Sequence, residues 1–205
     1  MLGKATAKIV GIRLNLALVF TVSVIPDIDL LLAPFLDHRG PTHSLFFCFI
    51  LFLPFLAAYK KKTIPYFVAF LSHSLIGDIL FTGIQLFWPF STNWIYLSSL
   101  SIRSGISTVL ELLIFVICTT IMLSNKDFQN LLSSNKSKIY WLIPFVAVLA
   151  PLFIGLINPD YYLPRLLVIP SLFYILIFFY STLGLKKQNA IPQKQLREIN
   201  KKPIP

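Results

Sequence analysis

Long apolar runs, separated by short polar or basic segments, follow one another along most of the chain. They cover about residues 9–25, 44–59, 64–88, 105–123, 140–157 and 163–184. A helix needs roughly 20 residues, within a range of about 17–25, to cross the hydrocarbon core of a bilayer. Most of the runs meet this length, although the second is short and the third is long enough to tilt. The sequence therefore predicts an all-α fold, a polytopic membrane helical bundle of about six transmembrane helices.

The composition favours the same class. Hydrophobic residues make up 56% of the 205 residues and charged residues 13%, about half of the roughly 25% that is usual in soluble domains. A soluble fold of this size could not bury so much apolar surface, whereas a bilayer covers it. The net charge of +10 lies in short clusters between apolar runs, so we expect membrane lipids as partners and no nucleic acid. We expect one transmembrane domain over residues 1–185 and a basic cytoplasmic tail over 186–205.

Basic residues are shared unequally between the two sides of the predicted bundle. If the N-terminus is cytoplasmic, all of the 18 Lys and Arg residues except Arg39, Arg103 and Arg165 fall on the cytoplasmic side. Cytoplasmic loops carry an excess of Lys and Arg, so six helices with both termini in the cytoplasm fit this bias. A five-helix arrangement would put the basic C-terminal segment on the opposite side from the other clusters. We therefore predict a multi-pass protein of the cell (plasma or inner) membrane.

Ionisable residues gather in one part of this apolar chain, between residues 27 and 78. The window contains all three histidines and four of the eight acids, namely Asp27, Asp29, Asp37, His38, His43, His73 and Asp78. Ionisable residues are costly within a membrane domain and indicate function by default. The alternative for Asp27 and Asp29 is a solvated turn after the first helix, and for His38 and Arg39 a polar loop.

The stretch PDIDLLLAPFLDHRGPTHS, residues 26–44, links the first two predicted helices on the outer side. Its middle part is strongly apolar, so we expect it to lie on the membrane domain or re-enter it. Gly40 and Pro41 predict a tight turn. Thr42 is placed to cap the second helix, which would put His43 and Ser44 in the first helical turn.

The third run contains SHSLIGD, residues 72–78, with His73 and Asp78 deep inside an apolar span. A separation of five residues turns an ideal α-helix by about 500°, so the two side chains would not share a face. A π-bulge near Gly77 would align them. The alternative is a single hydrogen-bonded His–Asp pair that only locks the bundle.

Three histidines and several carboxylates can converge on one site in such a bundle. Imidazole and carboxylate ligands suit a divalent metal, with zinc as the first choice and manganese or iron as alternatives. Glu111 lies within the fourth run and fits a ligand, a base or a structural hydrogen bond about equally well. Arg39 and Arg103 could bind a phosphate on the outer side, although Arg103 alone fits an ordinary interfacial charge.

PDID, then HRGPTHS, then SHSLIGD followed by TGIQLFWP, resembles the motif order of the YdjM-like membrane-bound metal-dependent hydrolases of bacteria and archaea. The resemblance covers roughly residues 20–90. It puts the following residues at the motif positions: Asp27, Asp29, His38, His43, His73 and Asp78. The order is also distantly similar to PD…H…H…HxxxD in zinc-dependent phospholipase C proteins, which suggests phosphoesters. The sequence departs from its relatives in having no histidine in residues 1–25 and in the longer His73–Asp78 spacing.

Together with this resemblance, the residues imply a metal-dependent hydrolase that acts on a phosphoester or lipid-like substrate at the extracytoplasmic face. We expect the metal to be held by His43, His73 and Asp78. Asp27 or Asp29 would complete the ligand set. His38 or Glu111 would act as acid or base, and Arg39 would orient an anionic substrate. The rival hypotheses are an ion- or proton-coupled transporter and a non-catalytic membrane scaffold.

Overall fold

The computed structural model describes residues 1–32, 35–98, 100–101, 104–133, 142, 144–146, 148–149, 152–154, 166 and 168–188, with side chains up to Tyr180 in the last range. The described residues form helices and connecting loops, and their only β-type contact is a single antiparallel bridge between Ile84 and Ile95. The all-α prediction is thereby confirmed. Most of the predicted tail at 186–205, together with Arg103 and Arg165, lies outside the described residues.

The first apolar run was predicted to form a single helix. It is instead divided between the end of one short helix and the whole of a second. α1 covers Leu2–Val10 and α2 covers Leu16–Ser23. Gly11 ends α1 in the left-handed region at φ 70°, and its N–H and that of Ile12 donate to carbonyls of the last turn, which is a Schellman-type stop. Asn15 then begins α2 by accepting a hydrogen bond from the Leu18 N–H. Both helices pack against α4.

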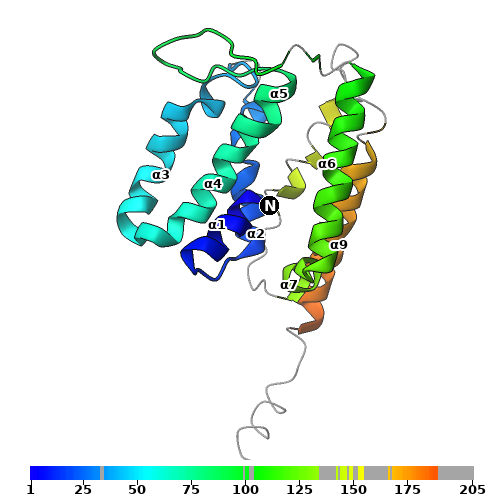
Figure 1. The fold of residues 1–205 in the computed structure, drawn as a ribbon. Coiled ribbons are helices and arrows are strands. Elements are labelled where there is room, and N and C mark those ends of the chain that lie inside the picture. The colour runs from blue at the N-terminus through cyan, green and yellow to red at the C-terminus, as the bar shows by residue number, and fades with distance from the viewer. Residues whose placement is uncertain are drawn as a thin grey trace, which may run out of the picture.

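The second and third runs form a helical hairpin (Figure 1). α3 covers Leu45–Tyr59, the 3-10 turn η3 covers Lys60–Thr63, and α4 covers Ile64–Ser72. The N-cap of α3 is Ser44, whose hydroxyl accepts the Phe47 N–H. The predicted cap at Thr42 is therefore wrong. Pro41–His43 forms a separate 3-10 turn, η2, because the φ of Pro41 and the Ser44 cap together delay the helix start.

The third run ends earlier than predicted. After α4 the chain continues through a π-helical segment, η4 (His73–Asp78), into the short α5 (Ile79–Phe81). Gly83, at φ 75°, closes this end by donating its N–H to the Asp78 carbonyl. A Cβ at Gly83 would stand 2.5 Å from the Tyr96 ring, so the chain turns into a loop here because only glycine fits. The loop carries Phe87, Trp88 and Phe90, which lie at or just after the end of the predicted third run.

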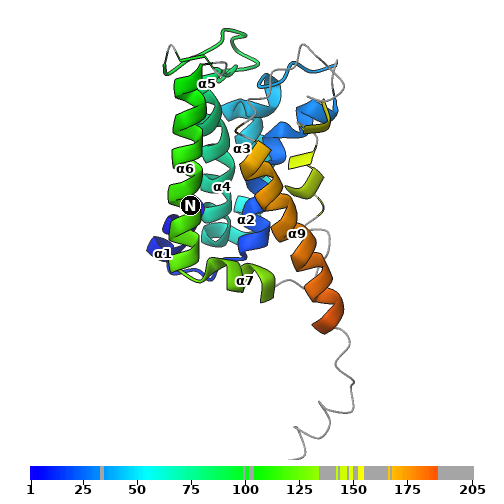
Figure 2. The same ribbon diagram turned by 90° about the vertical axis from the view of Figure 1, so that its right-hand side faces the viewer.

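The remaining described helices lie on the side of α1, α2 and α4 that faces away from α3 (Figures 1 and 2). α6 covers Gly105–Ser124, α7 covers Asp127–Ser133 and α9 covers Val168–Gln188. Phe115 of α6 packs its ring against Phe173 and Tyr174 of α9. The α6 bounds agree closely with the predicted run at 105–123, whereas the run at 140–157 is described only in part.

Two described segments are long and apolar enough to cross a membrane, Leu45–Phe81 and Gly105–Ser124. The first contains the α3–α4 hairpin, and a shorter apolar helix follows at Val168–Tyr180. Leu113, Ile117 and Leu123 are among the large apolar side chains that α6 exposes, as a helix in contact with lipid does. The six-span bundle is not confirmed, since α2 has only 8 residues and a spanning helix needs about 20.

The two ends of the bundle differ in charge. η3, with its three consecutive lysines, and α7 lie toward one end, and α5 lies at the other (Figures 1 and 2). The segments that follow α2 and precede α3 also lie at the α5 end. This arrangement places η1 (Ile25–Leu31), η2 and η4 close together, and their side chains form the candidate site.

Candidate metal centre

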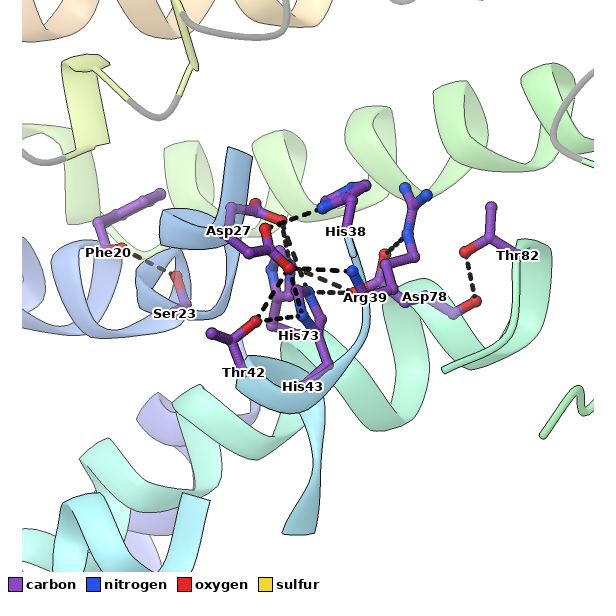
Figure 3. Close-up of polar contacts among 11 residues, drawn as sticks. Phe20, Ser23, Asp27, His38, Arg39, Thr42, His43, His73, Asp78 and Thr82 are labelled. Atoms are coloured by element: carbon purple, nitrogen blue, oxygen red, sulfur yellow. Dashed lines mark hydrogen bonds and ion pairs between the residues drawn. The ribbon is translucent and has the colours of Figure 1, made fainter. Parts of the chain in front are cut away.

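Three segments that are far apart in the sequence supply the polar residues at this end of the bundle (Figure 3). η1 supplies Asp27, η2 supplies His43, and η4 supplies both His73 and Asp78. Pro26 starts η1 directly after α2, and Pro41 starts η2, so each turn is fixed by a residue whose φ is already set. The site is thus built on short, tight turns next to the helix ends.

The π-helical geometry of η4 is what brings His73 and Asp78 together. The Ile79 N–H donates to the Ser74 carbonyl, five residues earlier, as π-helical bonding requires. His73 Nε2 lies 3.3 Å from Asp78 Oδ2. The predicted π-distortion around Gly77 is confirmed, and it converts a spacing that would point two ways on an α-helix into a common face.

Four donor atoms converge: Asp27 Oδ1, His43 Nε2, His73 Nε2 and Asp78 Oδ2. Each histidine nitrogen faces both carboxylates, at 3.6 and 3.3 Å from His43 and at 3.2 and 3.3 Å from His73. Tetrahedral zinc with bonds of about 2.0–2.2 Å has ligand atoms roughly 3.3–3.6 Å from one another. The four histidine–carboxylate distances lie close to this range, and Asp27, His43 and His73 each offer a ligand atom within 4.8 Å of the other two.

Two of these donor atoms are buried and have no hydrogen-bond partner: His43 Nε2 and Asp78 Oδ2. A buried polar atom without a partner costs about 1–3 kcal/mol, and more when it is charged. A shared cation would satisfy both atoms at once. The donor chemistry, two imidazoles and two carboxylates, also fits a divalent metal. The residues present therefore fit a metal centre.

Asp29 lies behind His43 and does not join the four converging atoms. Its fully buried carboxylate accepts hydrogen bonds from the Arg39 N–H and the Thr42 hydroxyl, both at 2.9 Å. Its Oδ2 also lies 3.3 Å from Nδ1 of His43, the ring nitrogen on the side away from the other donors. A carboxylate in this position fixes the orientation and tautomer of a ligating histidine. Asp29 is therefore placed to support His43, and its predicted role as a ligand stays a prediction.

Asp29→Asn is expected to weaken metal binding about 10- to 100-fold, as loss of an outer carboxylate does, without removing a donor atom. The amide keeps one acceptor oxygen but carries no negative charge. It therefore cannot accept from the Arg39 N–H and the Thr42 hydroxyl and also form ion pairs with both histidines. Competition against a chelator of known affinity measures the change. Asp37→Asn is the matched control, because Asp37 is exposed in the same loop. Equal affinities for the two variants would contradict this role for Asp29.

His38 and Arg39 occupy the rim. His38 Nδ1 lies 2.9 Å from Asp29 Oδ1, and its ring packs edge-on against His43. Arg39 donates from Nε to Asp78 Oδ1 at 2.8 Å, and within the described residues its terminal guanidinium nitrogens have no recorded partner. Its φ of 66° is uncommon for a residue other than glycine, and such strain is concentrated at functional sites.

The segment after α5 holds this rim in place. The Gln85 N–H donates to the Arg39 carbonyl at 3.1 Å, and the Leu45 N–H donates to the Leu86 carbonyl at 3.0 Å. A Cβ on Gly40 would stand 2.8 Å from the Asp37 carbonyl oxygen and 3.3 Å from Gln85 Oε1. Neither Thr42 nor Gln85 was predicted from the sequence to belong to the site. The TGIQLFWP motif was the only signal for Gln85, and nothing local indicated what it contacts.

Electrostatic coupling perturbs the groups on the two connecting turns. Burial by itself would raise the pKa of the Asp27 carboxyl, but His73 and His43 outweigh it and hold this pKa well below its usual range. The pKa of Asp29 is likewise held low, against burial, by His38 and His43. Burial would lower the pKa of His43, but the nearby carboxylates of Asp27, Asp29 and Asp78 raise it to about 10. A metal must therefore displace a proton from His43, so metal binding competes with protonation.

Glu111 stands apart from the four donor atoms. Glu111 of α6 is near enough to interact electrostatically with Arg39 and Asp78, but no hydrogen bond or ion pair joins it to either within the described chain. Arg103 lies outside the described residues. A second group also has metal-ligand spacing and consists of Asp27, Asp29 and His38. Its two carboxylates already make the contacts with the three histidines that are described above.

The comparisons with known proteins give one match. The model of a family described as YdjM inner membrane protein matches residues 1–162, a range that contains every residue of the centre and its rim. Neither the curated proteins nor the solved structures contain a match.

Proposed function

Because this chain belongs to the YdjM inner membrane protein family, we propose that it is a multi-pass inner-membrane protein and a metal-dependent hydrolase. Its substrate would be a phosphoester or lipid-like molecule at the extracytoplasmic face. The observation that carries the proposal is the convergence of four donor atoms from three segments, two of them buried without a hydrogen bond.

In this proposal Asp27, His43, His73 and Asp78 hold the metal. Zinc is the first candidate, and manganese and iron are the alternatives, since all accept imidazole and carboxylate ligands. When bound, the metal supplies Lewis acidity and lowers the pKa of a water toward about 7. The side chains of the centre hold the donor atoms at fixed spacing, so the metal needs no large rearrangement to bind.

His38 is the better candidate for the acid or base. Its Nδ1 is held by Asp29, which leaves Nε2 at the rim, and its side chain is 22% exposed. A histidine oriented by a carboxylate is the usual arrangement for proton transfer. Glu111 lacks such an orienting partner among the described residues, and a second role in positioning Arg39 electrostatically suits it better.

Arg39 is the candidate for binding the anionic part of the substrate. Its Nε is fixed on Asp78, and the two terminal nitrogens remain for a phosphate, which arginine binds through paired hydrogen bonds. The ion pair also ties the substrate-binding group to a metal ligand. A phosphoester bound by Arg39 would therefore lie beside the four donor atoms.

The proposed orientation rests on the two ends of the bundle. Lys60, Lys61 and Lys62 lie at the hairpin turn, away from the centre, and lysine-rich loops favour the cytoplasmic side. The centre would then open on the outer side. The exposed side chains of Phe87, Phe90 and Trp94 in the loop after α5 would lie at the membrane–water interface on that side, as aromatic residues do.

The test is turnover of a panel of soluble and lipid phosphoesters by purified full-length protein, before and after chelation and after reloading with zinc, manganese or iron. We expect one metal to restore activity lost on chelation. His38→Ala should keep its metal and lose about 10²- to 10⁴-fold in kcat. Ion flux into proteoliposomes without turnover would favour a transporter, and bound metal with neither flux nor turnover would favour a scaffold.

A further inference from the structure

A cavity of about 160 Å³ lies inside the bundle between α1, α2, α4, α6, α7 and α9. One end is lined by Ser23, the last residue of α2, and by Ser72, the last residue of α4. Ser72 directly precedes His73, and Ser23 stands four residues before Asp27. The part of the cavity lined by Ser23 and Ser72 therefore lies near the metal centre.

Two serines and one ion pair in the wall of this cavity already have hydrogen-bond partners. The Ser23 hydroxyl donates to the Phe20 carbonyl (Figure 3), and the Ser72 hydroxyl donates to the Ala69 carbonyl, each within its own helix. At the far end Lys4 donates to both carboxylate oxygens of Asp127, at 2.5 and 2.6 Å. These groups do not require a polar ligand.

The rest of the wall is mainly apolar and comes from α2, α4, α6 and α9. It includes Leu16 and Val19 of α2, Met122 of α6 and the Tyr174 ring of α9. A volume of this size holds a ligand about as large as benzene, which is roughly six carbon atoms. The size and chemistry of the cavity thus fit a short stretch of hydrocarbon chain better than water or an ion.

We propose that this cavity binds an acyl chain of a lipid phosphoester whose head group lies at the metal centre. The inference rests on the proposed function and narrows its substrate class to lipids with at least one flexible hydrocarbon chain. Ser23 and Ser72 mark the passage from head group to chain, and the Lys4–Asp127 ion pair closes the other end. Soluble phosphoesters would reach the centre but leave the cavity empty.

The test uses the full-length protein in lipid nanodiscs that contain a phospholipid with a photoactivatable diazirine at about the sixth carbon of one chain. After illumination, labelled residues are mapped by mass spectrometry. We expect label on Phe20, Cys118 or Tyr174, which line the cavity.

Cys118→Phe fills the cavity from α6 and should reduce this labelling about tenfold, as overpacking by 1–3 kcal/mol implies. Ile117→Phe is the matched control, since Ile117 is 56% exposed on the same helix. Label confined to outward side chains such as Ile117 in the wild type would overturn the inference, even if the protein hydrolyses phosphoesters. Cavity labelling without any turnover would leave the chain site standing and contradict the hydrolase proposal instead.

Discussion

His43→Ala is expected to lose metal binding by more than about 100-fold, beyond the 10- to 100-fold typical of outer residues. His43 Nε2 faces both Asp27 and Asp78, and its Nδ1 connects the centre to Asp29. Removing the ring takes away one donor atom and the contact of His43 with the buried Asp29 carboxylate. The metal content of purified protein, measured by mass spectrometry after gel filtration, tests this result.

The expected loss is specific to the centre. Yield and helical circular dichroism should stay close to the wild type, because the main apolar contacts between α2, α3 and α4 do not involve His43. Asp37→Asn, in the same connecting segment, should keep the full metal content. A His43→Ala protein that still carries one metal per chain would show that the ion lies elsewhere.

Insertion of one alanine between Gly77 and Asp78 is expected to abolish metal binding about as completely as His43→Ala. The insertion moves Asp78 to six residues after His73 and turns it by about 100° away from the common face. Asp78 Oδ2 would then leave both histidine nitrogens, which it now faces at 3.3 Å. Every ligand is still present in the chain, so the loss would arise from geometry alone.

Deletion of Gly77 is the matched control and should preserve metal binding. It leaves Asp78 four residues after His73, and residues four apart share a face of an α-helix. The π-helical segment should then become ordinary α-helix, since a π-bulge accommodates one extra residue. Gly77→Ala should also be silent, because a Cβ there meets nothing within 4 Å. Equal metal loss in the insertion and the deletion would contradict this account of η4.

The sequence predicts the structure well where local spacing and composition decide it. The five-residue separation of His73 and Asp78 required a distorted helix, and η4 is π-helical. The apolar run at 105–123 had no internal breaker, and α6 covers nearly the same residues. The position of His43 beside His73 and Asp78 was expected, because ionisable groups that stand alone in an apolar domain are costly.

The predictions from sequence are wrong or incomplete in two places. One is a helix stop and start inside an apolar run, and the other is a set of contacts that only the tertiary fold determines. Gly11 and Asn15 are a helix stop and a helix start four residues apart, and they divide a run that looked continuous. Asp27 and Asp29 could not be told apart from the sequence. Their different roles depend on η1 being a 3-10 turn that points one carboxylate at His73 and the other at His38.

X-ray absorption at the metal edge of the purified, full-length protein tests the central claim most directly. We expect about one metal per chain, with four nitrogen or oxygen neighbours at about 2.0–2.2 Å if the metal is zinc, and outer scattering from two imidazole rings. His73→Ala should remove one ring from this signal. Sulfur neighbours from Cys48 or Cys118, or a shell without imidazole, would contradict a centre made of Asp27, His43, His73 and Asp78.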